Sequence, residues 1–105
     1  ILKFYLHISL EEQKERFQKR LDRPDKNWKF KSGDLDTRKK WDKYMTAFEE
    51  VFLRCSPETA SWHIIPADQK WYRNLAISRV IVSAIREMNP QYPLAEEGLD
   101  GITIE

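Results

Sequence analysis

The sequence has 105 residues, which is enough for one modest domain. Its 18 lysines and arginines nearly balance its 17 aspartates and glutamates, which argues against a dedicated nucleic-acid-binding protein. Cys55 is the only cysteine, which excludes an internal disulfide and fits a reducing compartment, so we expect a cytoplasmic protein without a leader. No run approaches the ~20 apolar residues of a membrane span, and we expect no membrane partner.

Residues 1–8 predict a β-strand, because apolar residues at even positions alternate with Lys3, Tyr5 and His7. We interpret His7 as structural, since no second histidine, cysteine or acidic residue stands at metal-ligand spacing. Ile1 is not a methionine and begins inside an apolar run, so we expect a piece of a longer chain.

Residues 10–22 predict a helix that starts at a capping box formed by Ser9 and Glu12, and that Pro24 stops. Leu10, Phe17 and Leu21 form its apolar face. Four cations spaced i, i+3, i+4 and i+7 share another face: Arg16, Lys19, Arg20 and Arg23.

This basic face has two interpretations. Guanidinium and ammonium groups on one face suit a grip on phosphate oxygens. Alternatively, the pairs Glu12–Arg16 and Glu15–Lys19 stabilise an exposed helix whose charged face is only solvated.

Two patterns follow that helix. Trp28 and Phe30 alternate with Lys29 and Lys31, which fits either a short extended segment or a loop anchored by its aromatics. Asp34 is the expected N-cap of a helix over residues 35–54. The apolar stripe of that helix is Leu35, Trp41, Met45, Phe48 and Phe52; Trp41, Tyr44 and Phe48 could stack on bases, but their helical spacing favours a core role.

Residues 62–66 predict a second strand, which Pro66 closes. Asp68 is the expected N-cap of a helix over residues 69–88, which is apolar nearly all round and therefore expected to be well buried. Pro90 and Pro93 follow it, and the tail at 89–105 is expected to be extended. Strands separated by helices predict a parallel α/β sheet, but two strands cannot bury this much apolar surface alone.

Four blocks in this order resemble the C-terminal part of the family-2 polyphosphate kinases, and they cover nearly the whole chain to Met88. The blocks are His-Ile-Ser-Leu-Glu-Glu-Gln-Lys-Glu-Arg-Phe at 7–17, Asp-Lys-Asn-Trp-Lys-Phe at 25–30, Trp-Asp-Lys-Tyr-Met-Thr-Ala-Phe-Glu at 41–49 and Ile-Pro-Ala-Asp-Gln-Lys-Trp-Tyr at 65–72.

The resemblance implies a three-layer α/β/α P-loop kinase-like sandwich, of which this chain is the C-terminal part of a single domain. It implies transfer of a terminal phosphoryl group between inorganic polyphosphate and a nucleoside mono- or diphosphate (ADP/ATP or GDP/GTP), with Mg2+ bound upstream, in a homo-oligomer. Residues 10–54 would be the lid, and residues 62–88 the final strand and helix. By position, Arg16 and Arg20 are the expected catalytic lid arginines, supported at phosphate by Lys29, Lys31, Lys19 and Arg23.

One departure from the family pattern limits this reading. None of the three glycines, Gly33, Gly98 and Gly101, lies in a Gly-x-x-x-x-Gly-Lys frame, and the Asp-Arg segment is absent. We therefore expect the 105-residue chain to be inactive alone, and either to self-associate through its apolar strand edges or to need its upstream half.

Asp68 and Lys70 follow the second strand, where open parallel sheets bind ligands, so they are candidates for holding a nucleotide. Two alternatives to the polyphosphate reading stay open: a fragment of a thymidylate-kinase-like enzyme with ATP as donor, and a non-enzymatic module whose basic stripe binds an acidic partner.

Overall fold

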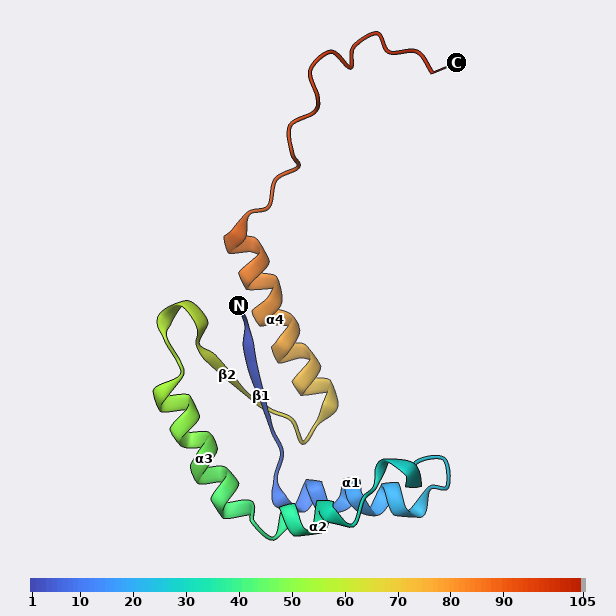
Figure 1. Ribbon diagram of the computed structural model, residues 1–105, viewed down its shortest axis with the longest axis vertical. Coiled ribbons are helices and arrows are strands. Elements are labelled where there is room, and N and C mark those ends of the chain that lie inside the picture. The colour runs from blue at the N-terminus through green and yellow to red at the C-terminus, as the bar shows by residue number, and fades with distance from the viewer. Residues whose placement is uncertain (105) are drawn as a thin grey trace.

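Two short strands run parallel at the centre of the molecule (Figure 1). The structure is a computed structural model that describes residues 1–104. Strand β1 (Lys3–His7) pairs with β2 (Trp62–Pro66) in the register Lys3↔Trp62 to His7↔Pro66. The predicted parallel α/β pairing is therefore confirmed, and the second strand has the predicted bounds.

Helices cover the two faces of this sheet. Tyr5 points to α3 (Trp41–Arg54), with its ring centroid 4.6 Å from that of Phe48 and 5.0 Å from that of Phe52. The opposite face meets α4 (Lys70–Met88), where Leu2 and His63 line one hollow together with residues of α4. The order helix, sheet, helix is the layering of an α/β/α sandwich.

The first helix, α1 (Leu10–Asp22), has the predicted bounds, but only half of the predicted capping box forms. The Ser9 Oγ accepts a hydrogen bond from the Glu12 amide at 3.1 Å. The Ser9 amide donates instead to Asp68 Oδ1 at 2.7 Å, so the Glu12 carboxylate is not needed there and pairs with Arg16. The start of α1 is thus tied to the end of β2.

We expect Ser9→Ala to lower the free energy of unfolding of the full-length protein by about 1 kcal/mol, because one amide of the first turn loses its acceptor. Urea unfolding followed by circular dichroism measures this. Ser32→Ala is the matched control, since Ser32 precedes α2 (Gly33–Arg38) without a side-chain capping bond. Equal losses for the two variants would show that the Ser9 hydroxyl does not stabilise α1.

The single helix predicted over residues 35–54 is wrong: the chain turns at Lys39 and Lys40, between α2 and α3. A straight 20-residue helix would be about 30 Å long and would run past the sheet. The Arg38 Nη1 instead donates to Leu10 O at 2.7 Å, which holds α2 against α1. The predicted cap is also wrong, because Asp34 lies inside the first turn of α2, where its Oδ2 accepts from the Lys31 amide.

The helix α4 is not well buried, contrary to the expectation. Trp71 is 66% exposed and Ile85 is 50% exposed, because a two-stranded sheet covers only one strip of an all-round apolar helix. Its end follows the predicted signals: Asn89 adopts a left-handed conformation with φ of 43° directly before Pro90. Residues 90–104 then run away from the body without forming a strand (Figure 1).

Little of the chain is enclosed. The radius of gyration is 22.1 Å, whereas a compact domain of this length has about 13 Å. Among the described residues only Ile65 and Ala67 are buried apolar side chains, and both lie on or next to β2. No helix in residues 1–104 has the length and apolar character to cross a membrane.

The helices α1 and α2 project past the carboxyl ends of both strands (Figure 1). One-turn 3-10 helices connect the larger elements, at Asn27–Lys29 between α1 and α2 and at Glu58–Ala60 between α3 and β2. Since ligands of open parallel sheets collect beyond the carboxyl ends, the projecting helices mark the region to search for a site.

Candidate functional site

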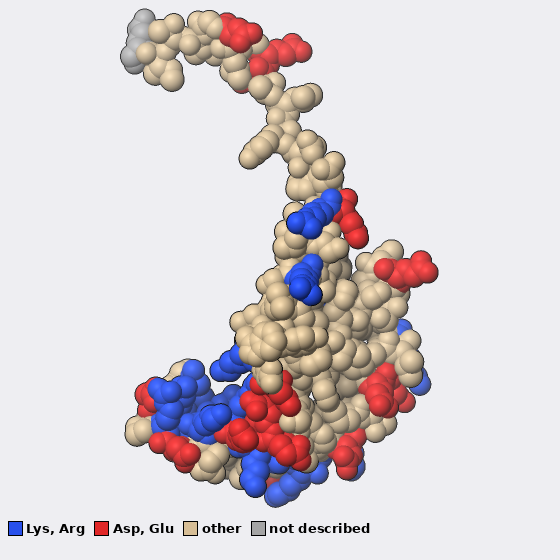
Figure 2. Space-filling model, turned by 180° about the vertical axis from the view of Figure 1, so that it is seen from behind, with Lys and Arg blue, Asp and Glu red and all other residues tan. Residues whose placement is uncertain are grey.

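A cationic pocket of about 240 Å3 lies beside α1. Three segments build it: the second half of α1, the turn that follows α1 and the first residue of α4. Its lining residues are all basic: Arg16, Lys19, Arg20, Lys26, Lys29 and Lys70. With six cations and no carboxylate in the lining, the pocket is suited to a multivalent anion. Figure 2 shows basic side chains gathered over the outer end of α1, with acidic ones alongside.

The turn after α1 folds back because side chains fasten it. The Asn27 Nδ2 donates to Arg20 O at 2.7 Å and to Leu21 O at 2.8 Å, which closes the end of α1. The Phe17 and Phe30 rings meet edge to face with centroids 5.7 Å apart. The interpretation of residues 27–31 as a loop anchored by aromatics therefore holds for Phe30, whereas the extended segment does not form.

The Trp28 side chain stays 75% exposed, with its indole Nε1 donating to Asp25 O at 3.0 Å. The Lys29 ammonium lies 5.0 Å from the centre of the Trp28 ring. This cation–π contact places a flat apolar surface beside the pocket without covering the ammonium group.

Arg20 and Lys19 keep their charged groups available. Arg20 is half-buried, its guanidinium carbon lies 5.6 Å from the centre of the Phe17 ring, and no described carboxylate pairs with it. Lys19 contacts Glu15 at 3.7 Å in an exposed pair, which solvent screens strongly. Both cations can therefore turn to an incoming anion at little cost.

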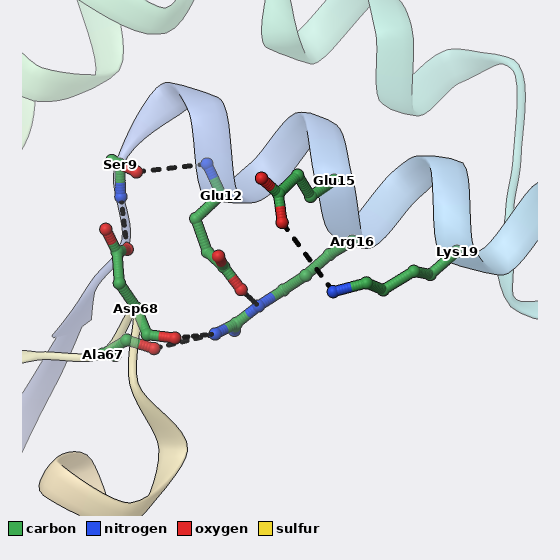
Figure 3. Close-up of polar contacts among 7 residues, drawn as sticks. All are labelled: Ser9, Glu12, Glu15, Arg16, Lys19, Ala67 and Asp68. Carbon is green, nitrogen blue, oxygen red and sulfur yellow. Dashed lines mark hydrogen bonds and ion pairs between the residues drawn. The ribbon is translucent and has the colours of Figure 1, made fainter.

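Arg16 is held differently (Figure 3). Its Nε donates to Glu12 Oε1 at 2.7 Å, and its Nη2 donates to Ala67 O at 2.8 Å and Asp68 O at 3.2 Å. Its guanidinium thus spans from α1 to the loop between β2 and α4. Arg16 adds its charge to the pocket, but two of its three nitrogens already serve the protein.

The structure brings together five of the eight residues predicted for the site: Arg16, Lys19, Arg20, Lys29 and Lys70. Two others lie apart from it. Arg23 forms a two-pronged pair with Asp25 at 3.0 and 2.9 Å, and Lys31 is exposed outside the pocket lining. Sequence reasoning missed Lys26, which lies one helical turn before Lys29; that i, i+3 spacing was the available signal.

Asp68, the eighth, does not cap α4 as predicted. The helix begins at Lys70, and neither Asp68 nor Gln69 makes a side-chain capping bond to it. Because the parallel strands end side by side, the carboxylate reaches Ser9 at the start of α1 instead. The hydrogen bonds from Ser9 lower the pKa of Asp68, and the charges of Arg16 and His7 lower it further.

A second pocket of about 330 Å3, between β1, α2 and α3, has a mainly apolar and aromatic lining. Trp41, Tyr44 and Phe48 line it; Phe48 packs on Tyr5 as the core interpretation predicts, whereas Tyr44 is 44% exposed. Arg38 also lines this pocket, but its Nη1 bonds Leu10 O and Gln13 Oε1. This pocket is therefore less suited to an anion than the cationic pocket.

Within residues 1–104, no three His, Cys, Asp or Glu side chains lie close enough together to hold a metal ion. Among these residues, His7 therefore belongs to no group of side chains that could hold a metal ion. The Mg2+ that the resemblance implies is expected to be bound upstream of this chain.

Comparison with known proteins identifies the fold family. The family described as Polyphosphate kinase 2 (PPK2) matches residues 1–93. The chain belongs to the polyphosphate kinase 2 family. It is 47% identical over 105 residues to an AMP/ADP-polyphosphate phosphotransferase of Meiothermus ruber, covering all of this chain and 39% of that protein. It is 48% identical over 97 residues to an uncharacterised protein of Leptolyngbya boryana, covering 92% of this chain and 71% of that protein.

A solved structure agrees with this family and with the P-loop kinase-like fold. The crystal structure of Polyphosphate Kinase 2 from Arthrobacter aurescens TC1 superposes with a TM-score of 0.89 at 40% identity, covering 94% of this chain and 35% of that one. This polyphosphate kinase 2 segment thus spans 39% of the Meiothermus ruber phosphotransferase and 35% of the Arthrobacter aurescens kinase.

Proposed function

We propose that this segment works as the C-terminal, lid-bearing part of a longer polyphosphate kinase 2, here termed the intact enzyme. That enzyme moves a terminal phosphoryl group between inorganic polyphosphate and a nucleoside mono- or diphosphate. The observation that supports this most is the cationic pocket, whose six basic side chains come from three separate segments. The relatives named AMP/ADP-polyphosphate and ADP-polyphosphate phosphotransferases support the choice of substrates.

We assign residues 10–54 the role of a lid over the phosphate chain. Arg20 and Lys19 supply charge from α1, Lys26 and Lys29 supply it from the returning turn, and Lys70 supplies it from α4. A linear polyanion can contact several of these groups at once, and a planar guanidinium binds phosphate oxygens bidentately. The charge that spreads over the transferred group is then stabilised by these cations.

The remaining parts of the proposal concern features of the intact enzyme that this segment does not carry by itself. Mg2+ is bound by the part of the intact enzyme that cradles the phosphates. A homo-oligomer is proposed from the family resemblance, and a cytoplasmic location from the single cysteine, which fits a reducing compartment. The donor distinguishes the main proposal from a thymidylate-kinase-like enzyme, which would use ATP.

The intact enzyme should form ATP from ADP and polyphosphate with Mg2+, whereas the 105-residue chain alone should form none. The reason is that the pocket can bind an anion, but the described residues provide neither a phosphate cradle nor metal ligands. A coupled ATP assay measures both proteins at equal concentration. Transfer only from ATP to a nucleotide would contradict the polyphosphate proposal. Turnover by the 105-residue chain would contradict the proposal that the rest of the intact enzyme supplies the phosphate cradle and the metal ligands.

A further inference from the structure

The contacts of Arg16 differ in kind from those of the other pocket cations. Its pair with Glu12 is 2.7 Å long, and the two side chains are only 24% and 22% exposed. The neighbouring pair of Lys19 and Glu15 is 3.7 Å long, with side chains 68% and 64% exposed. Since low exposure limits solvent screening, the Arg16 pair is the one that fixes a geometry.

The acceptors on the other side of Arg16 are themselves fixed. Ala67 is 1% exposed, and its amide donates to His7 O at 2.7 Å, which extends the β1–β2 pairing by one residue. The Ala67 carbonyl that receives the Arg16 Nη2 is therefore part of the sheet edge. Asp68 makes the second link between this loop and α1, because its carboxylate accepts a hydrogen bond from the Ser9 amide at the start of α1.

These bonds form a closed ring that joins α1 to the β2–α4 loop at two points (Figure 3). Within residues 1–104, Arg16 makes the only side-chain hydrogen bonds from the body of α1 to this loop. Lys70 directly follows the loop and lines the cationic pocket together with the cations of α1. The distance between Lys70 and the α1 cations therefore depends on this ring.

We propose that Arg16 is a positioning residue, a latch that holds the β2–α4 loop and Lys70 in register with Lys19 and Arg20. This inference rests on the proposed function for its consequence but not for its geometry. A planar guanidinium offers donors in two directions at once, so it can hold Glu12 and the loop carbonyls together. A lysine has one ammonium group on a flexible stem and cannot reproduce this arrangement.

The test uses hydrogen exchange of the ligand-free intact enzyme, read by mass spectrometry over peptides that contain the Ser9 and Ala67 amides. Arg16→Lys should raise exchange of both amides about 10- to 100-fold, because charge-assisted hydrogen bonds hold the loop. Glu12→Ala, which leaves the guanidinium on the carbonyls, should raise it by about 3- to 10-fold. Glu15→Ala is the matched control on the same helix and should leave both amides unchanged.

Steady-state kinetics with polyphosphate adds a readout that a purely structural role would not move. Arg16→Lys should raise KM for polyphosphate about tenfold while kcat stays within about threefold, because Lys70 is misplaced but the other cations remain. Arg23→Lys, outside the pocket, should change neither constant. Unchanged exchange at Ser9 and Ala67 would overturn the latch, and unchanged exchange with a large loss of kcat would make Arg16 a direct phosphate contact.

Failure of the latch and failure of the proposed function give different results. If the exchange differences appear but the unmutated intact enzyme does not use polyphosphate, the latch stands and the substrate assignment falls. If Arg16→Lys does not fold, Glu12→Ala decides the latch on its own: exchange equal to that of Glu15→Ala overturns it.

Discussion

Arg20→Lys in the intact enzyme is expected to lower turnover with polyphosphate about 30- to 1,000-fold, equivalent to about 2–4 kcal/mol of transition-state stabilisation. Arg20 lines the cationic pocket, and no described carboxylate pairs with it, so its guanidinium is available to bind phosphate oxygens with two donors. The lysine variant keeps the charge but loses the planar fork. Initial rates of ATP formation over a range of polyphosphate concentrations measure the change.

Arg23→Lys is the matched control for this experiment. Arg23 lies just beyond the same helix, but its guanidinium is bound to Asp25 and is outside the pocket lining. Its replacement should leave kcat and KM within about twofold, as expected for an exposed ion pair. Wild-type turnover in Arg20→Lys would mean that the basic face of α1 is only solvated.

Ile65→Ala is expected to lower the free energy of unfolding of the intact enzyme by about 2–5 kcal/mol. Ile65 is 6% exposed and is the fourth of the five residues of β2, on the face that meets α4; it is the most buried large side chain among the described residues. Removing its three outer carbons loses the free energy that is gained when they are buried, and it leaves a cavity beside α4. Urea unfolding at equilibrium measures the loss.

Ile64→Ala supplies the comparison, since Ile64 is the preceding residue of β2 but is 54% exposed and faces α3. It should cost less than half as much, because less apolar surface returns to water. If urea unfolding gave the two variants equal losses of stability, the face of β2 toward α4 would be packed no more closely than the face toward α3.

The strands and α1 followed from the sequence because local signals set them. The bounds predicted for β2 and α1 match the structure, since Pro66, Ser9 and Pro24 act on their own neighbourhood. The two faces of β1 also follow the predicted alternation, and the face with Tyr5 packs under α3.

The breaks and caps that the sequence analysis got wrong depend on distant partners. The turn between α2 and α3 accompanies a bond from Arg38 to Leu10, which lies 28 positions earlier. Asp68 was expected to serve its own helix, but the strand ends bring it to Ser9, 59 positions away. No local pattern encodes these pairings, so only the assembled sheet reveals them.

The sequence predicted the basic character of the candidate site but not the full set of residues that line it. The helical spacing placed Arg16, Lys19 and Arg20 on one face, and the pocket lies on that face. The spacing also included Arg23, and it could not show that Asp25 would occupy that guanidinium. Equally, it gave Arg16 and Arg20 the same role, whereas in the fold Arg16 donates to the Ala67 carbonyl and Arg20 lies over the Phe17 ring.

The side chain of Asn27 reduces the repulsion that an anion meets from the carbonyl groups at the end of α1. Helix carbonyls at a carboxyl end carry a partial negative charge of about half an elementary charge, so such an end ordinarily repels phosphate. Lys19, Arg20 and Lys29 lie at that end of α1, and the Asn27 amide covers the Arg20 and Leu21 carbonyls. The macrodipole therefore attracts these cations to the carboxyl end of α1, while the capped carbonyls oppose the arriving anion less. Attraction at this end comes from mobile side chains rather than backbone amides, which lets one site accommodate phosphate chains of differing length and path.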